Sequence, residues 1–200
     1  APAGAGGAQR QKEDYIGRQI KAWYRSWESS IEFAQLDDPR AHEFKAFFLA
    51  NQPAQVTASV VHGDYYLHNC LFSEASKVSA VLDWELATLG DPLADLGYTL
   101  RAWPEIDDDP FLEPTAPTAV SGLPLRGELA QRYSERTGFP VDLLDYYVGF
   151  NHWKTAAILH GVYARYQAGQ KSSEGVDLEA LKDGILKGLA GAERAILRLQ

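Results

Sequence analysis

Three oxygen-bearing side chains lie close together in the middle of the sequence. Asp64 and Asn69 bracket a short loop between two apolar fragments, and Asp83 follows the next apolar fragment, residues 78–82. Because a hairpin brings the ends of its strands together, we expect these three side chains to converge on one point. Two carboxylates and an amide carbonyl suit Mg²⁺, which prefers oxygen ligands and retains water and phosphate oxygens around it.

The same set of side chains can also provide a general base, since one carboxylate can accept a proton from an attacking hydroxyl group. Phosphoryl transfer needs this combination: a metal ion neutralises the phosphates, and a carboxylate orients the nucleophile. A metal-dependent hydrolase could use the same cluster, but it would need a second metal site, for which Glu85 and His68 are the only nearby candidates. The residues therefore favour phosphoryl transfer over hydrolysis.

The composition argues against several other classes of protein. The chain has 200 residues, with 19 Lys and Arg against 27 Asp and Glu, and a formal net charge of −8. This acidity argues against a nucleic-acid partner, which requires a basic face. No apolar run approaches the roughly 20 residues that span a bilayer, and no signal peptide is apparent. We expect no membrane association and, with Cys70 as the single cysteine, a cytoplasmic location.

The apolar periodicity predicts helices on both sides of the loop. The expected helices cover approximately residues 13–31, 39–51, 92–103, 125–137, 143–168 and 178–196. Short β-branched or apolar fragments at 56–61, 70–72 and 78–82 predict strands, and the last two form a hairpin around a polar turn. The predicted fold class is therefore α+β: a mainly helical body around a small β-hairpin element that carries the loop.

The motif region resembles the aminoglycoside phosphotransferase and choline kinase superfamily, which shares the protein-kinase-like fold. His-Gly-Asp at residues 62–64, four further residues, Asn69, and then Asp83 after a strand are similar to the catalytic core of that superfamily. The longer string VLDWELATLGDPLADL, residues 81–96, resembles most closely the kinase domains fused to some acyl-CoA dehydrogenases. The resemblance implies a protein-kinase-like carboxy-terminal lobe.

This resemblance also implies roles for five residues. Asp64 would be the catalytic base or would orient the acceptor hydroxyl, and Asn69 and Asp83 would bind Mg²⁺ between the nucleotide phosphates. His62 would brace the catalytic loop, and Asp95 would hold it through backbone hydrogen bonds. The implied reaction transfers the γ-phosphoryl group of ATP or GTP to a hydroxyl group of a small molecule. A hydroxyacyl-type acceptor is favoured over aminoglycosides, amino alcohols and sugars.

A complete enzyme of this kind also has an amino-terminal lobe, with a phosphate-covering loop and a strand lysine. Neither is expected here, because the Gly-rich stretch at residues 4–7 precedes a helical pattern and Lys12 lies on no β pattern. We therefore expect a flexible amino-terminal segment at residues 1–12 and the carboxy-terminal lobe at 13–200, without the nucleotide-binding lobe and poorly active alone. The alternative is a non-catalytic binding module, although such modules usually lose the Asp64 position or its partners.

Several further residues have a structural and a functional interpretation. The spacing of the histidines matches no zinc template, so His68, His152 and His160 are interpreted as incidental. Tryptophans are mostly core residues, which is the interpretation given to Trp84, Trp103 and Trp153. The acidic run 107–109 is solvated surface, or else a rim that attracts a cationic substrate. The acceptor is expected near Tyr65, the loop at 103–117 and the helix face that bears Asn151 and Lys154.

Overall fold

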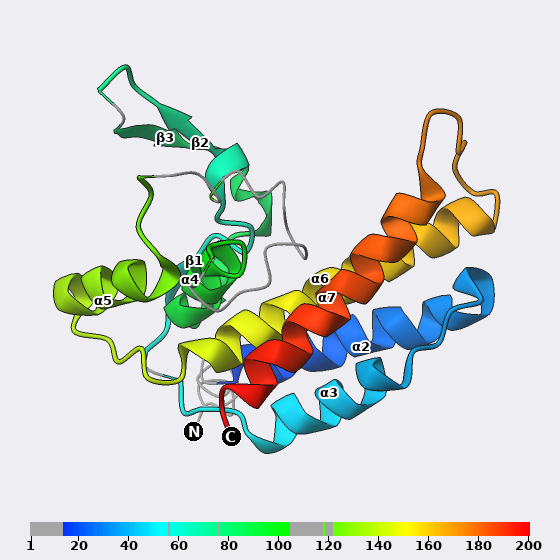
Figure 1. Ribbon diagram of the computed structural model, residues 1–200, viewed down its shortest axis with the longest axis horizontal. Coiled ribbons are helices and arrows are strands. Elements are labelled where there is room, and N and C mark those ends of the chain that lie inside the picture. Colours follow the sequence, from blue (N-terminus) through cyan, green and yellow to red (C-terminus); the bar gives the residue numbers. More distant parts are fainter. Residues whose placement is uncertain (1–13, 56, 76, 105–117, 119–121) are drawn as a thin grey trace, which may run out of the picture. The chain divides into compact units, whose positions relative to one another are not determined.

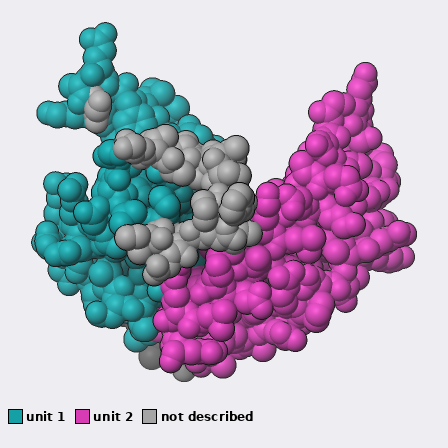
Figure 2. Space-filling model, viewed as in Figure 1, with its two compact units in different colours: residues 1–15, 54–148 teal, residues 16–53, 149–200 magenta. Residues whose placement is uncertain are grey.

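The computed structural model describes residues 14–55, 57–75, 77–104, 118 and 122–200 (Figure 1). The predicted flexible segment with its Gly-rich stretch and Lys12, and the acidic run 107–109, lie outside the described residues. The chain divides into two compact units, residues 1–15 with 54–148 and residues 16–53 with 149–200 (Figure 2). Each unit buries its own set of apolar side chains.

The unit of residues 16–53 and 149–200 is helical, as predicted. It contains most of α2 (Tyr15–Ala34), α3 (Pro39–Ala50), the greater part of α6 (Leu144–Gln167) and α7 (Leu178–Leu197). Helix α6 is buried over most of its circumference. In the part of the chain that the structure describes, no helix combines the length and the apolar character needed to cross a bilayer.

The core of this helical unit includes a buried histidine. The His160 ring stacks on Trp27 with the ring centroids 3.9 Å apart, and its Nε2 donates a hydrogen bond to the Leu36 carbonyl at 2.8 Å. Burial lowers the pKa of His160, because removal from water disfavours the charged imidazolium. These contacts give His160 a structural role.

The other unit carries the strands. β2 (Cys70–Phe72) and β3 (Val78–Val81) form the predicted antiparallel hairpin. β1 (Ser59–Val61) pairs instead with β4 (Thr88–Gly90), also antiparallel, and this three-residue β4 was too short to be predicted from its pattern. The described residues therefore form two separate two-stranded sheets, β1 with β4 and β2 with β3.

This unit also contains α4 (Pro92–Leu100) and α5 (Arg126–Thr137). The prediction that α4 continues to Trp103 is wrong, because the Trp103 N–H bonds to the Leu100 carbonyl in a tighter turn that ends the helix. The buried Arg126 guanidinium donates to the carbonyls of Leu100 and Trp103, at 3.0 and 2.7 Å. This cation satisfies backbone acceptors at the carboxy-terminal end of α4.

The amino-terminal end of α4 is capped by a buried carboxyl group. Asp91 is 1% exposed and accepts hydrogen bonds from the Leu93 N–H at 3.0 Å and from the Tyr147 hydroxyl at 2.8 Å. Burial raises the pKa of Asp91, and the two hydrogen bonds offset this effect only in part. The native protein therefore binds this proton more tightly than the unfolded chain does.

This raised pKa predicts how stability depends on pH. The contribution of Asp91 to the free energy of unfolding is greatest at low pH and falls as the pH rises from its usual pKa of 3.8 through the raised value. We expect Asp91→Asn to remove this fall, while Asp142→Asn, at an exposed carboxylate, preserves it. Urea unfolding of the three proteins between about pH 4 and pH 7 measures the difference. Parallel curves for wild type and Asp91→Asn would contradict the prediction.

Candidate active site

The loop from His62 to Asn69 lies beside the segment that contains Asp83, and the two are joined at both ends. The loop lies between β1 and β2, and the segment lies between β3 and β4. β1 pairs with β4 at one end, and β2 pairs with β3 at the other. The Leu82 N–H donates to the Asn69 carbonyl at 2.8 Å, and His62 Nε2 donates to the Leu82 carbonyl at 2.7 Å. Asp83 is thereby brought beside the loop that carries Asp64.

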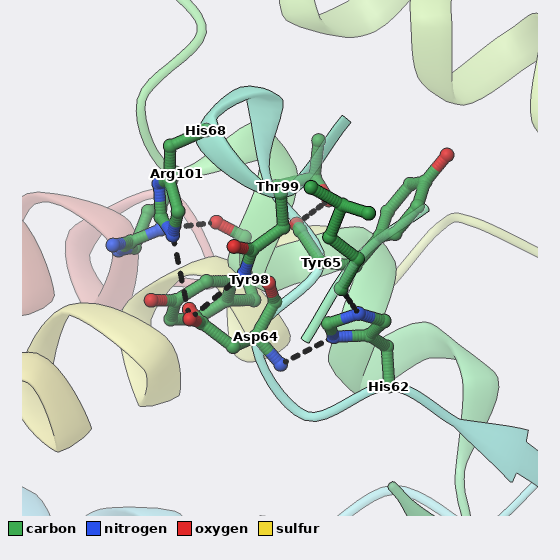
Figure 3. A network of polar contacts seen from close by, with 9 residues as sticks. His62, Asp64, Tyr65, His68, Tyr98, Thr99 and Arg101 are labelled. Atoms are coloured by element: carbon green, nitrogen blue, oxygen red, sulfur yellow. Dashed lines mark hydrogen bonds and ion pairs between the residues drawn. The ribbon is translucent and has the colours of Figure 1, made fainter. Parts of the chain in front are cut away.

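His62 is buried and uses both of its ring nitrogens. Nδ1 accepts a hydrogen bond from the Asp64 N–H at 3.3 Å, while Nε2 donates to the Leu82 carbonyl. These two contacts require the tautomer that is protonated on Nε2. His62 thus links the backbone of Asp64 to the segment that leads into Asp83 (Figure 3).

The prediction that Trp84 is a core residue is wrong. Trp84 is 52% exposed, and its ring lies against His62 with the ring centroids 4.8 Å apart. Its indole N–H donates to the Val81 carbonyl at 2.9 Å, so the ring is held next to the loop without entering the core. Trp103 and Trp153 are buried, as predicted.

Asp95, on α4, holds the turn that precedes Asp64. Its carboxylate accepts hydrogen bonds from the backbone N–H groups of His62 at 2.5 Å and Gly63 at 2.9 Å. Gly63 has a φ of +86°, and a Cβ atom there would lie 3.0 Å from the Leu86 carbonyl oxygen, so the turn requires glycine. One carboxylate and one glycine therefore fix the backbone on which Asp64 sits.

The Asp64 carboxylate receives hydrogen bonds from three side chains (Figure 3). The Tyr98 hydroxyl is one donor, and Nε2 of His68 and Nδ2 of Asn69 lie 3.4 and 3.0 Å from Oδ2. Burial alone would raise the pKa of Asp64, but the three hydrogen bonds together hold it below its usual value. Asp64 is therefore an anion at neutral pH, well suited to orient a hydroxyl group and only weakly basic.

The sequence motif includes neither Tyr98 nor Arg101, although both support Asp64. Burial raises the pKa of Tyr98 to about 12, so its hydroxyl keeps its proton and acts as a donor. The Arg101 guanidinium lies over the Tyr98 ring, 3.8 Å from its centroid, and donates to the Tyr98 carbonyl at 2.5 Å. A signal was present in the sequence, because Tyr98 follows Asp95 by three positions and so shares its helix face.

Loss of the Tyr98 hydroxyl is expected to raise the pKa of Asp64. Tyr98→Phe keeps the ring but removes a donor that favours the carboxylate over the neutral acid. The carboxyl ¹³C shift of Asp64, followed against pH, measures the change. Tyr133→Phe, on α5, is the control and should leave that titration unaltered. An unchanged or lower pKa in Tyr98→Phe would refute the role given to this hydroxyl.

Asn69 and Asp83 offer oxygen atoms to a divalent cation. The Asn69 amide nitrogen donates to the carbonyl and carboxylate of Asp64, at 2.8 and 3.0 Å, which fixes the amide and leaves its carbonyl oxygen for a ligand. Asp83 is exposed, has a left-handed φ of +61°, and makes no capping hydrogen bond to the turn that follows it. An amide oxygen and a carboxylate fit Mg²⁺, which also retains water and phosphate oxygens.

The residues predicted to bind the acceptor or a second metal belong to different parts of the chain. Among the described residues, no group of three or more His, Cys, Asp or Glu side chains is arranged to hold a metal ion. Asn151 and Lys154 are buried and belong to the helical unit, and residues 105–117 lie outside the described part. Tyr65 lies beside His62, with the ring centroids 6.0 Å apart.

Known proteins provide an independent view of the chain. Residues 2–124 match the phosphotransferase enzyme family. The chain is 37% identical over 167 residues to acyl-CoA dehydrogenase family member 10 of Mus musculus, an alignment that covers 80% of the chain and 15% of that protein. It is 31% identical over 166 residues to acyl-CoA dehydrogenase family member 11 of Homo sapiens, with 80% and 21% covered. The chain thus spans only 15–21% of the length of these relatives.

A solved structure extends the comparison to the fold. The crystal structure of a Ralstonia eutropha protein assigned as an aminoglycoside phosphotransferase superposes with a TM-score of 0.71 and 27% identity, covering 91% of this chain and 56% of that one. This likeness confirms the predicted fold class, a mainly helical kinase-like architecture with small antiparallel sheets. Because the family match also covers more than half of the sequence, including residues 62–95, the chain belongs to the phosphotransferase enzyme family.

Proposed function

We propose that this chain is the carboxy-terminal lobe of an enzyme that transfers the γ-phosphoryl group of a nucleoside triphosphate to a hydroxyl group of a small molecule. The observation that carries the proposal is the pair of hydrogen bonds at Leu82, which sets Asp83 beside the loop of Asp64 and Asn69. Family membership supports phosphoryl transfer as the reaction. The geometry supports the roles proposed for the individual residues.

In this proposal Asp64 orients the acceptor. Its lowered pKa keeps the carboxylate ionised, so that it accepts a hydrogen bond from the acceptor hydroxyl and directs the oxygen lone pair at the γ-phosphorus. The carboxylate is weakly basic, so its main contribution is alignment. The acceptor oxygen bonds to the γ-phosphorus as the bond from that phosphorus to the β-phosphate oxygen breaks, and the hydroxyl proton passes late to the Asp64 carboxylate and from there to water. Tyr98, His68 and Asn69 fix the carboxylate in the orientation this requires.

Asn69 and Asp83 would hold Mg²⁺, the first through its amide oxygen and the second through its carboxylate. The ion, when bound with the nucleotide, neutralises negative charge that develops on the phosphates. His62 and Asp95 act as positioning residues, because they hold the backbone of Asp64 and of the segment before Asp83 without facing the substrate.

A further lobe is proposed to bind ATP or GTP, while residues 13–200 form the lobe that binds the acceptor. The strands and their connections carry large apolar side chains that are each at least 42% exposed: Val60, Leu71, Phe72, Val78, Leu82, Leu86 and Leu89. An apolar surface of this extent normally binds a partner. The Ralstonia structure, of which the chain covers 56%, supports this view. The 200-residue chain alone is therefore expected to transfer phosphate poorly.

The names of the relatives support one class of acceptor. Both belong to acyl-CoA dehydrogenase families, which favours a hydroxyacyl compound over an aminoglycoside, an amino alcohol or a sugar. The test is a screen of these four acceptor classes with the full-length protein and Mg-ATP or Mg-GTP, read by mass spectrometry of the products. We expect a phosphorylated product that depends on Mg²⁺ and is absent with Asp64→Asn. Nucleotide binding without any phosphorylated acceptor would favour the non-catalytic binding module instead.

A further inference from the structure

A cavity of about 470 Å³ lies against the catalytic loop, on a different face of α4 from the candidate active site. Asp95 and Tyr98 are the α4 residues that bind the part of the loop around Asp64, Asp95 at the His62 and Gly63 N–H groups and Tyr98 at the Asp64 carboxylate. Leu96, Leu100 and the nearby Trp103 instead line the cavity. Its volume is in the range of small-molecule sites. The cavity therefore adjoins the catalytic loop, through Tyr65, Tyr66 and Leu67, but Asp64, Asn69 and Asp83 are not among its lining residues.

The walls of the cavity are largely apolar and aromatic. Phe72 and Val78 of the β2–β3 hairpin, Leu129 of α5 and the rings of Tyr65 and Tyr133 contribute to them. None of the described lining residues is acidic, although the whole chain has a net charge of −8. This lining suits the apolar part of a ligand. Its net charge is positive, opposite in sign to that of the chain.

That positive charge comes from two arginines of α5. Arg132 and Arg136 are four positions apart, so they lie on the same face of the helix, and both are exposed while lining the cavity. Where the structure describes the chain, neither forms an ion pair with a carboxylate. Guanidinium groups bind carboxylates through paired hydrogen bonds. An apolar cavity with two such groups on its solvent side matches a molecule with an apolar chain and an anionic head.

We propose that this cavity binds a small amphipathic carboxylate, with its chain against Leu96 and Leu100 and its head at Arg132 and Arg136. The ligand is distinct from the phosphoryl acceptor, because Asp64 does not line the cavity, and so the proposal does not depend on the proposed function. The cavity is coupled to the loop backbone, since Thr99 lines the cavity and its hydroxyl donates to the Tyr65 carbonyl at 2.5 Å.

The single cysteine of the chain provides the readout. Cys70 lines the cavity and is partly exposed, so the rate at which a thiol reagent modifies it reports whether the cavity is occupied. The probes are decanoate, decanol and decyltrimethylammonium, which share one chain length and differ in head charge, each below its micelle concentration. We expect decanoate to protect Cys70, decanol to protect it about tenfold more weakly, a difference of about 1.4 kcal/mol, and the cation to give no protection.

Variants locate the head of the ligand. Arg132→Gln/Arg136→Gln is expected to weaken protection by decanoate about tenfold and to leave protection by decanol unchanged, because only the charged contacts are lost. Arg165→Gln, at an exposed arginine of α6, is the matched control and should behave as wild type. Asp64→Asn should also keep full protection, which separates this site from phosphoryl transfer. Absent protection, equal protection by the three probes, or full decanoate protection in the double variant would overturn the proposal.

Discussion

Asp64→Asn is expected to lower the rate of phosphoryl transfer by about 10²–10⁴-fold, the usual contribution of a positioned acid–base group. The amide has nearly the shape of the carboxylate, but it carries no negative charge to align the acceptor hydroxyl. It also brings a second donor against Asn69, whose amide nitrogen lies 3.0 Å from Oδ2 of Asp64. Initial rates of the full-length protein, at saturating acceptor and Mg-ATP, measure the loss.

The control for this variant must separate chemistry from folding. Asp64→Asn should unfold in a single cooperative thermal transition, because the loop backbone is also held by Asp95 and His62. Asp142→Asn, a matched change at an exposed carboxylate, should retain the wild-type rate. A folded Asp64→Asn protein with a nearly normal rate would remove Asp64 from the reaction.

Asp83→Asn is expected to weaken the binding of Mg²⁺, because it replaces a charged ligand with a neutral one. The Mg²⁺ concentration that gives half-maximal activity should rise by at least about 10–100-fold, the cost of losing even an outer-shell partner of a metal ligand. Asparagine tolerates the left-handed φ of +61° found at this position, so the backbone should persist. A titration of the transfer rate with Mg²⁺ measures the shift.

A neighbouring carboxylate serves as the matched control for this change. Glu85 is also exposed and lies two residues further along the chain, so Glu85→Gln should keep the wild-type Mg²⁺ dependence. High Mg²⁺ should restore part of the rate of Asp83→Asn but none of the rate of Asp64→Asn, because only the first variant has a weakened metal site. An unchanged Mg²⁺ titration in Asp83→Asn would refute its role as a ligand.

Much of the site could be predicted because its members lie in two short, local stretches of sequence. The spacing from Asp64 to Asn69 is fixed by one turn, and the hairpin pattern after it places Asp83 at the end of a strand. Helix boundaries also followed from local chemistry, as at α3, where Asp38 caps the helix and Pro39 occupies its first turn.

The remaining parts depend on contacts between distant segments. Tyr98 joins the site only because α4 packs so that Asp95 binds the loop, and the spacing of motifs does not report that packing. Trp84 is as apolar as a core residue, yet the tight turn after Asp83 leaves its ring outside, against His62. β4 is a strand only because β1 provides its hydrogen bonds, since its three residues are too few for a periodic signal.

The most direct test of the proposed catalytic centre is the double variant Asp64→Asn/Asp83→Asn, assayed with the two single variants for phosphoryl transfer in the full-length protein at saturating Mg-ATP. Both carboxylates are proposed to act in one transfer step, so the double variant should be no more than about threefold slower than the slower single variant. Losses that multiply in the double variant, or single variants that keep the wild-type rate, would contradict a shared centre.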